Sequence, residues 1–111
     1  MSIDIKPGSD LNSINLGSNG TIPVAIFSTV DFDATKVDAL TVTLADASVK
    51  VKGKGTALAA PQDVNGDGLL DLAVHVLTSV LSLTTTATEA ALVGEVFGGG
   101  TIRGTDFIRV V

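Results

Sequence analysis

Three residue types that anchor many small folds are absent from this sequence: it has no Cys, no Trp and no Tyr. Without Cys the chain is not a disulfide-stapled scaffold and cannot bind zinc through thiolates, although this absence does not identify a cellular compartment. Its aromatic residues are four Phe, while 45% of the residues are hydrophobic. The core must therefore consist of Val, Ile, Leu and Ala with a few Phe. We expect residues 1–111 to form a single domain with one modest core.

Basic residues are also few. Lys and Arg total 7 against 12 Asp and Glu, which gives a net charge of −5. A surface of this sign repels nucleic acid and anionic membranes, so neither is an expected partner. No stretch approaches the ~20 consecutive apolar residues of a membrane helix. The first residues lack the basic start and apolar run of a signal peptide, which favours a module cut from a longer secreted protein over a cytosolic protein.

Short segments that alternate apolar and polar residues, separated by turn residues, predict β-strands. We expect strands at residues 2–6, 14–16, 21–28, 40–44, 47–52, 72–77, 89–97 and 106–111. Asp33 resembles a helix N-cap and predicts a single helical or 3₁₀ turn. Residues 79–88 are ambiguous, because Val80, Leu81 and Leu83 could pack under a sheet while the Thr residues that follow disfavour a helix.

This strand pattern predicts an all-β fold, an antiparallel immunoglobulin-like β-sandwich of about seven to eight strands. A small β-barrel is the alternative. Closure of the sheets requires that the end strands be paired. These strands carry Ile3 and Ile5 near one terminus and Ile108 and Val110 near the other. We therefore expect both termini to be ordered.

One stretch, DVNGDGLLD at residues 63–71, concentrates oxygen donors at alternate positions. Ca²⁺ takes about six to eight oxygen ligands, and a short loop supplies them when every second residue turns inward. The first, third, fifth, seventh and ninth places of such a loop are here Asp63, Asn65, Asp67, Leu69 and Asp71. Leu69 would bind through its carbonyl oxygen, and Asp71 would bind directly or through a water. The spacing predicts a Ca²⁺ site at these five residues.

The loop differs from a helix-loop-helix EF-hand. Its twelfth place, where that motif has a bidentate Glu, is Val74, and residues 72–77 alternate as a strand. Gly68 at the sixth place permits the sharp turn that the loop needs. The alternative is an Asx-rich turn without a metal, because Asn-Gly and Asp-Gly are also common hairpin turns. Three carboxylates that would repel one another without a cation favour the metal.

Several motifs together resemble a recurrent module of large secreted bacterial proteins: IDIKPGS at 3–9, NSIN at 12–15, IPVAI at 22–26, DFDAT at 31–35, DVNGDG at 63–68 and GTD at 104–106. The resemblance covers nearly the whole chain, although Leu11 stands where members usually have Pro. It implies an extracellular or cell-surface location, neighbouring β-sandwich or anchoring domains, and no assigned catalysis. The loop alone also resembles those of dockerins and integrin-type propellers, but dockerins pair two such loops with helices and propellers repeat theirs.

No group of residues predicts catalysis, so we expect that the chain is not an enzyme. His75 is the only histidine, and no local signature supplies a nucleophile or an orienting acid. Glu89 and Glu95 on one strand would lie about 20 Å apart, too far for glycoside hydrolysis. Lys6 and Asp106, near the first and last strands, are a candidate pair for an intramolecular isopeptide bond like those of some adhesin sandwiches.

These features predict a calcium-stabilised, non-catalytic structural or adhesive module of a larger secreted or surface protein, with calcium and neighbouring domains as partners. A calcium-dependent carbohydrate-binding module is the alternative. A further ligand would be a protein or a glycan for an adhesive module, and a glycan for the alternative. Sugar binding usually relies on exposed Trp or Tyr side chains for stacking. Such a module would here have to bind through calcium-chelated hydroxyls or polar contacts. A glycan array read with and without calcium separates the two predictions.

Overall fold

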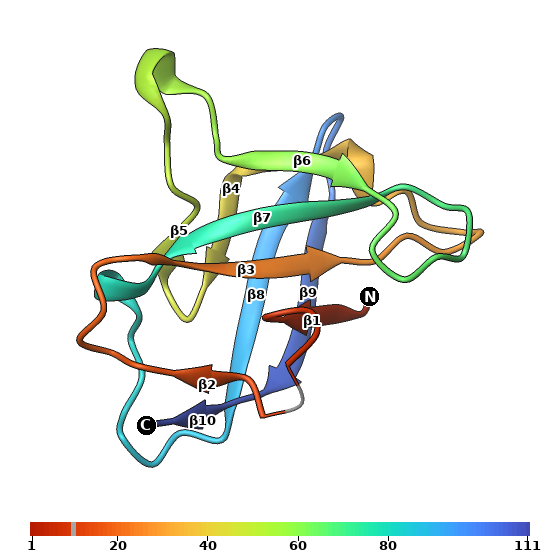
Figure 1. The fold of residues 1–111 in the computed structure, drawn as a ribbon. Helices are drawn as coiled ribbons and strands as arrows, with labels where there is room; N and C mark the ends of the chain where they lie inside the picture. The colour runs from red at the N-terminus through yellow and green to blue at the C-terminus, as the bar shows by residue number, and fades with distance from the viewer. Residues whose placement is uncertain (10) are drawn as a thin grey trace.

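The first sheet of the computed structural model, which describes residues 1–9 and 11–111, is antiparallel and has four strands (Figure 1). Its order is β1 (Ile3–Ile5), β3 (Thr21–Ile26), β7 (Asp71–Leu77) and β6 (Ala59–Gln62). β3 is a central strand, as its apolar sequence predicts, and Val24, Ala25 and Ile26 are fully buried. Ile22, Val24 and Ile26 turn one face of β3 toward the core, whereas Thr21 and Pro23 on the other face are only partly buried.

The second sheet is also antiparallel and has the order β5 (Ala47–Ser48), β4 (Val37–Leu44), β8 (Glu89–Val96) and β9 (Thr101–Phe107). β4 and β5 form the predicted hairpin. Its turn residues Ala45 and Asp46 have φ of 46° and 67°, which is the conformation of a two-residue type I′ turn. The expected glycine turn joins β8 to β9 through Gly98–Gly100, all at positive φ.

The two sheets pack as a sandwich, and Figure 1 shows their strands crossing one another in two layers. A short parallel pair, β2 (Ser13–Ile14) with β10 (Arg109–Val110), forms a separate two-stranded sheet whose Ile14 is buried in the same core. The other strands, taken in chain order, reproduce the A-B-E-D and C′-C-F-G sheets of an immunoglobulin sandwich. The predicted sandwich is confirmed. The barrel alternative is wrong, because the two sheets remain separate and keep their edge strands.

The core lies between the sheets and consists of aliphatic side chains, as the shortage of aromatic residues requires. Leu72, Val74 and Val76 alternate inward on β7 and are buried, as predicted. Leu92 of β8 is buried opposite them, and Val96 packs against the same core. This burial of apolar surface is the main favourable term in folding, at about 25 cal/mol per Å².

Several predicted boundaries are wrong. The strand expected at residues 106–111 is the end of β9, which already begins at Thr101, followed by the separate β10. Residues 59–62, expected to be a link, form the edge strand β6. The strand expected at 47–52 keeps its sheet pairing only in β5, because the chain then crosses to the other sheet, where Val49 bridges Val76. Val80 is half exposed at the end of η3 (Thr78–Val80) and does not pack under a sheet, whereas Leu81 and Leu83 contact the core.

Two other 3₁₀ turns connect strands. η1 (Ala34–Lys36) begins at the predicted N-cap Asp33, whose side chain accepts a hydrogen bond from the Thr35 N–H. η2 (Gly53–Gly55) precedes β6. No helix in the described residues is long and apolar enough to cross a membrane.

Both termini are ordered, as expected. Ile3 and Ile5 pair with β3, and Val110 pairs with Ile14. Asp106 ties the first strand to the last, because its Oδ2 accepts a hydrogen bond from the Ile5 N–H at 2.9 Å.

The isopeptide candidates have different partners in this structure. The Lys6 Nζ donates to the Ser13 carbonyl oxygen at 2.7 Å, while Asp106 Oδ2 accepts from Ile5 and from the Asn12 Nδ2. Through these hydrogen bonds Lys6 and Asp106 both hold the N-terminal segment in place.

Candidate metal centre

The predicted loop joins β6 to β7, and its first aspartate organises it. Asp63 accepts hydrogen bonds from the N–H groups of Gly66 and Gly68, both at 2.9 Å. Gly66 and Gly68 have φ of 74° and 87°, a region that strains any residue with a Cβ. Glycine at these two places therefore lets the chain curl around the Asp63 carboxylate.

Two further side chains stabilise the turn locally. Asn65 Oδ1 accepts from the Asp67 N–H at 3.3 Å, and Asp67 Oδ1 accepts from the Leu69 N–H at 2.9 Å. Both bonds run from a side chain to the backbone two residues later, which is the pattern of an Asx turn. The loop conformation thus follows directly from the alternation of Asp and Asn along the sequence.

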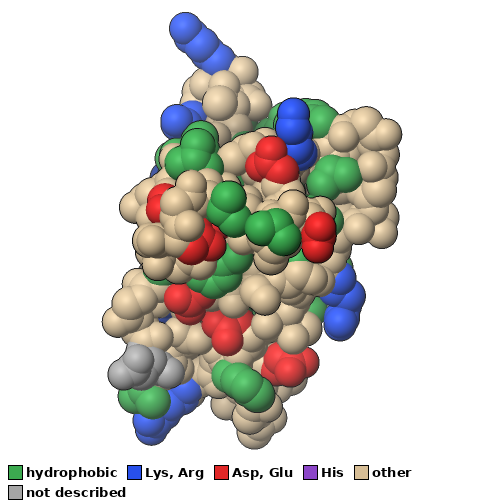
Figure 2. Space-filling view, turned by 90° about the vertical axis from the view of Figure 1, so that its right-hand side faces the viewer, with side chains coloured by type: hydrophobic (Ala, Val, Ile, Leu, Met, Phe, Trp, Pro, Cys, Tyr) green, Lys and Arg blue, Asp and Glu red, His purple; other side chains and the backbone are tan. Residues whose placement is uncertain are grey.

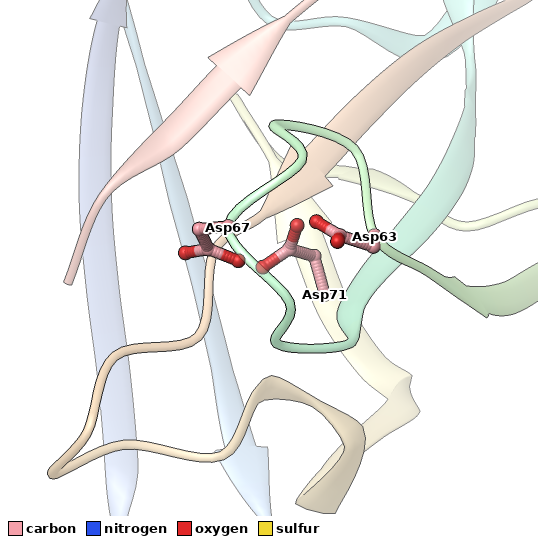
Figure 3. A group of neighbouring side chains, drawn as sticks. All are labelled: Asp63, Asp67 and Asp71. Atoms are coloured by element: carbon pink, nitrogen blue, oxygen red, sulfur yellow. The ribbon is translucent and has the colours of Figure 1, made fainter.

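Three carboxylates meet inside this loop. Asp63, Asp67 and Asp71 each offer an oxygen, and these oxygens lie within 4.8 Å of one another. Figure 3 shows the Asp71 side chain between those of Asp63 and Asp67, inside the curve of the loop. Asp71 is fully buried, Asp63 is partly buried and Asp67 is exposed. The cluster therefore opens to solvent on the side of Asp67.

Asp71 also connects the loop to the rest of the sandwich. Its Oδ1 accepts from the Ser28 N–H at 2.8 Å, and its Oδ2 accepts from the Val64 N–H at 2.9 Å. Ser28 makes two more bonds, because its Oγ donates to the Leu70 carbonyl at 2.6 Å and accepts from the Ala34 N–H at 2.8 Å. These bonds hold the β6–β7 loop, called the metal-loop candidate below, against the segment that follows β3.

Ser28 is a site residue that the sequence reasoning missed. The sequence pattern places Ser28 only at the end of a predicted strand, and Ser28 lies 43 residues before its partner Asp71. The one local signal is a polar residue that closes an apolar run. No spacing rule connects it to the loop, since the contact depends on the antiparallel pairing of β3 with β7.

The residues fit a hard cation. Every predicted donor is an oxygen, and each carboxylate oxygen keeps a lone pair beyond the hydrogen bond that it accepts. Val74, at the twelfth place, is fully buried in the core, so it supplies no ligand. The cluster of three Asp could hold a metal ion. Coordination by Asn65 and by the Leu69 carbonyl stays a prediction.

The residues weighed for catalysis lie apart from this cluster in the fold. His75 is half-buried in β7, opposite Pro23 of β3. Glu89 and Glu95 lie at the two ends of β8, and both are exposed.

No family model, no curated protein and no solved structure matches the chain.

Proposed function

We propose that this chain is a calcium-stabilised structural or adhesive module, without catalytic activity, of a larger secreted or surface protein. The observation that carries the proposal is the meeting of three aspartate oxygens within 4.8 Å in the β6–β7 loop. Like charges at this separation repel one another, and a divalent cation converts that repulsion into attraction. The cation would be held by Asp63, Asp67 and Asp71, together with Asn65 and the Leu69 carbonyl.

Calcium is favoured over other metals by the donor types. Carboxylate, amide and carbonyl oxygens suit hard cations, whereas zinc and copper prefer imidazole and thiolate ligands. Ca²⁺ also accepts a flexible, incomplete set of protein ligands more readily than Mg²⁺, which requires near-ideal octahedral geometry. An acidic module with a site of this kind suits an extracellular, calcium-rich setting.

The structural role is supported by the position of the loop. Asp71 is at once a member of the carboxylate cluster, the first residue of β7 and an acceptor for Ser28. A cation bound there would fix the point where β7 enters the core and would hold the segment after β3 beside it. Modules of this kind act by keeping their shape between neighbouring domains of a parent protein.

Isothermal titration with calcium tests the proposal. The metal-stripped chain should bind one Ca²⁺ with a Kd of about 10⁻⁴–10⁻³ M or tighter. Asp67→Ala should weaken binding by about tenfold or more, because it removes a charged ligand. Glu89→Ala, which removes an exposed charge outside the loop, is the matched control and should leave the Kd unchanged. No heat of binding at millimolar calcium, or equal affinity in the wild type and Asp67→Ala, would contradict the proposal.

A further inference from the structure

The segment after β3 exposes a hydrophobic residue that the fold does not require. Thr29 and Phe32 bridge to each other through two backbone hydrogen bonds of 2.8 and 3.3 Å, so Val30 and Asp31 form the tip of a tight turn. Gly, Asn, Asp and Ser are the usual residues at such a tip. Val30 is instead a β-branched apolar residue and is 92% exposed.

This turn and the metal-loop candidate together line one groove. The groove has a volume of about 530 Å³ and lies between the two segments. Its apolar lining comes from Val30 and Phe32 on one side and from Leu69 and Leu70 on the other. Leu70 is 55% exposed, which adds a second prominent apolar side chain to that of Val30.

The two sides of the groove are hydrogen-bonded to each other, which holds them at a fixed separation. Ser28, at the base of the turn, donates to Asp71 and to the Leu70 carbonyl and accepts from Ala34. Figure 1 shows the two segments side by side at one end of the sandwich. A binding surface that is already ordered loses little conformational entropy when it is occupied.

Acidic side chains lie on the turn side of the apolar groove: Asp33 lines the groove, and Asp31 is exposed at the tip of the turn beside Val30. The two segments that form the groove, residues 27–36 and 63–71, contain five Asp, of which Asp71 is buried, and a single Lys, Lys36. The hydrogen bond from the Thr35 hydroxyl lowers the pKa of Asp33, which keeps that carboxylate ionised. Figure 2 shows hydrophobic side chains in the upper middle of this face, with Asp and Glu side chains beside and below them and Lys or Arg side chains above. A bound divalent cation would reduce this negative charge but not reverse it.

We propose that this groove binds a protein segment that combines a bulky apolar side chain with flanking Lys or Arg residues. The apolar side chain would fill the space between Val30 and Leu70, and the basic side chains would lie against Asp31 and Asp33. Charge complementarity excludes two other occupants. A second copy of this chain carries the same acidic face and a net charge of −5, and an anionic membrane would be repelled. The proposal does not depend on which cation the loop binds.

Peptide display on the intact chain tests this inference. A phage library of random linear peptides, selected on the immobilised chain in millimolar calcium, should enrich sequences that place Lys or Arg beside a bulky apolar residue. A synthetic peptide of the enriched sequence should bind more weakly as salt rises from about 0.05 to 0.3 M, because the Debye length shrinks. Failure to enrich any sequence, or enrichment of acidic peptides, would overturn the proposal.

Matched variants locate the binding surface. Val30→Ser and Leu70→Ser should each raise the Kd of the synthetic peptide by about tenfold, as expected for apolar contacts at the centre of an interface. Asp31→Asn should weaken it mainly at low salt. Val80→Ser removes an apolar residue that is 51% exposed outside the groove and should have no effect. Unchanged binding by Val30→Ser would overturn the proposal. So would self-association in sedimentation equilibrium that Val30→Ser abolishes, because the occupant would then be a second copy.

Discussion

Asp71 and Asp67 belong to the same carboxylate cluster but have different environments. Asp71 is fully buried, and each of its oxygens accepts a backbone hydrogen bond. Asp67 is exposed and bonds only within its own turn, to the Leu69 N–H. We infer that Asp71 contributes to stability with or without a cation, whereas Asp67 contributes chiefly when a cation is bound.

Substitution of each aspartate in the presence of a chelator tests this difference. Asp71→Asn turns one acceptor oxygen into an NH₂ donor that faces a backbone N–H, so it should lower the free energy of unfolding by about 1.5–3 kcal/mol. Asp67→Asn should change it by less than about 0.5 kcal/mol. Urea unfolding followed by circular dichroism measures both values, since the chain has no Trp or Tyr for fluorescence. Equal losses in the two variants would refute the distinction.

At the scale of single residues, the sequence identified the carboxylate cluster but not its supports. Asp63, Asp67 and Asp71 follow a local spacing rule, and the structure brings them together. Ser28 is connected to them only by strand pairing. Asn12 is a similar case, because it is buried and its Nδ2 donates to Asp106 and to the Phe107 carbonyl, residues at the other end of the chain. Contacts of this range leave no periodic signal in a single sequence.

Among the strands, those with strong alternation were predicted and those stabilised by their neighbours were not. β7 has apolar residues at every second place, Leu72, Val74 and Val76, and its predicted start differs from the observed one by a single residue. β6 has the sequence AAPQ, which lacks β propensity. It forms because it can pair along β7, and it tolerates Pro61 because it is an edge strand. The first residues of β9 were not predicted, because Gly104 interrupts the alternation of apolar and polar residues there.

Asp4 on β1 lies near Asp106 on β9, and this pair predicts that the stability of the fold depends on pH. Partial burial, and then the negative charge of Asp106, raises the pKa of Asp4 on β1 above its ordinary value of 3.8. A raised pKa means that the folded chain holds this proton more tightly than the unfolded chain. The contribution of Asp4 to stability is therefore fully present below pH 3.8 and is lost as the pH rises through its folded-state pKa.

Asp4→Asn should remove the loss of stability that ionisation of Asp4 causes as the pH rises. At pH 7 the variant should be more stable than the wild type by about 0.5 kcal/mol or less, because solvent screens a partly exposed pair. The difference should shrink toward zero as the pH falls below 3.8, where the wild-type carboxyl is protonated. Melting temperatures of both proteins at neutral and acidic pH, at low salt, measure the effect. If Asp4→Asn is less stable than the wild type at pH 7, or if its melting temperature differs from that of the wild type by the same amount at both pH values, the pKa of Asp4 is not raised in the folded chain.

Over the whole molecule, the β6–β7 loop connects parts of the chain that are distant in sequence. It belongs to the first sheet through β6 and β7, and Asp71 holds the segment after β3. We propose that a cation bound at Asp63, Asp67 and Asp71 stabilises this whole end of the sandwich. Binding to the folded chain alone would add about 2.7 kcal/mol at a ligand concentration a hundred times the Kd.

Scanning calorimetry in calcium and in chelator measures this stabilisation. For a domain of this size, such a gain corresponds to a rise in melting temperature of about 10 °C in saturating calcium. The rise should be mostly lost in Asp67→Ala and kept in Glu89→Ala. Asp67→Ala should cost little in chelator, where one of three mutually repelling charges has been removed. A wild-type melting temperature that is the same in calcium and in chelator would contradict a structural role for the metal.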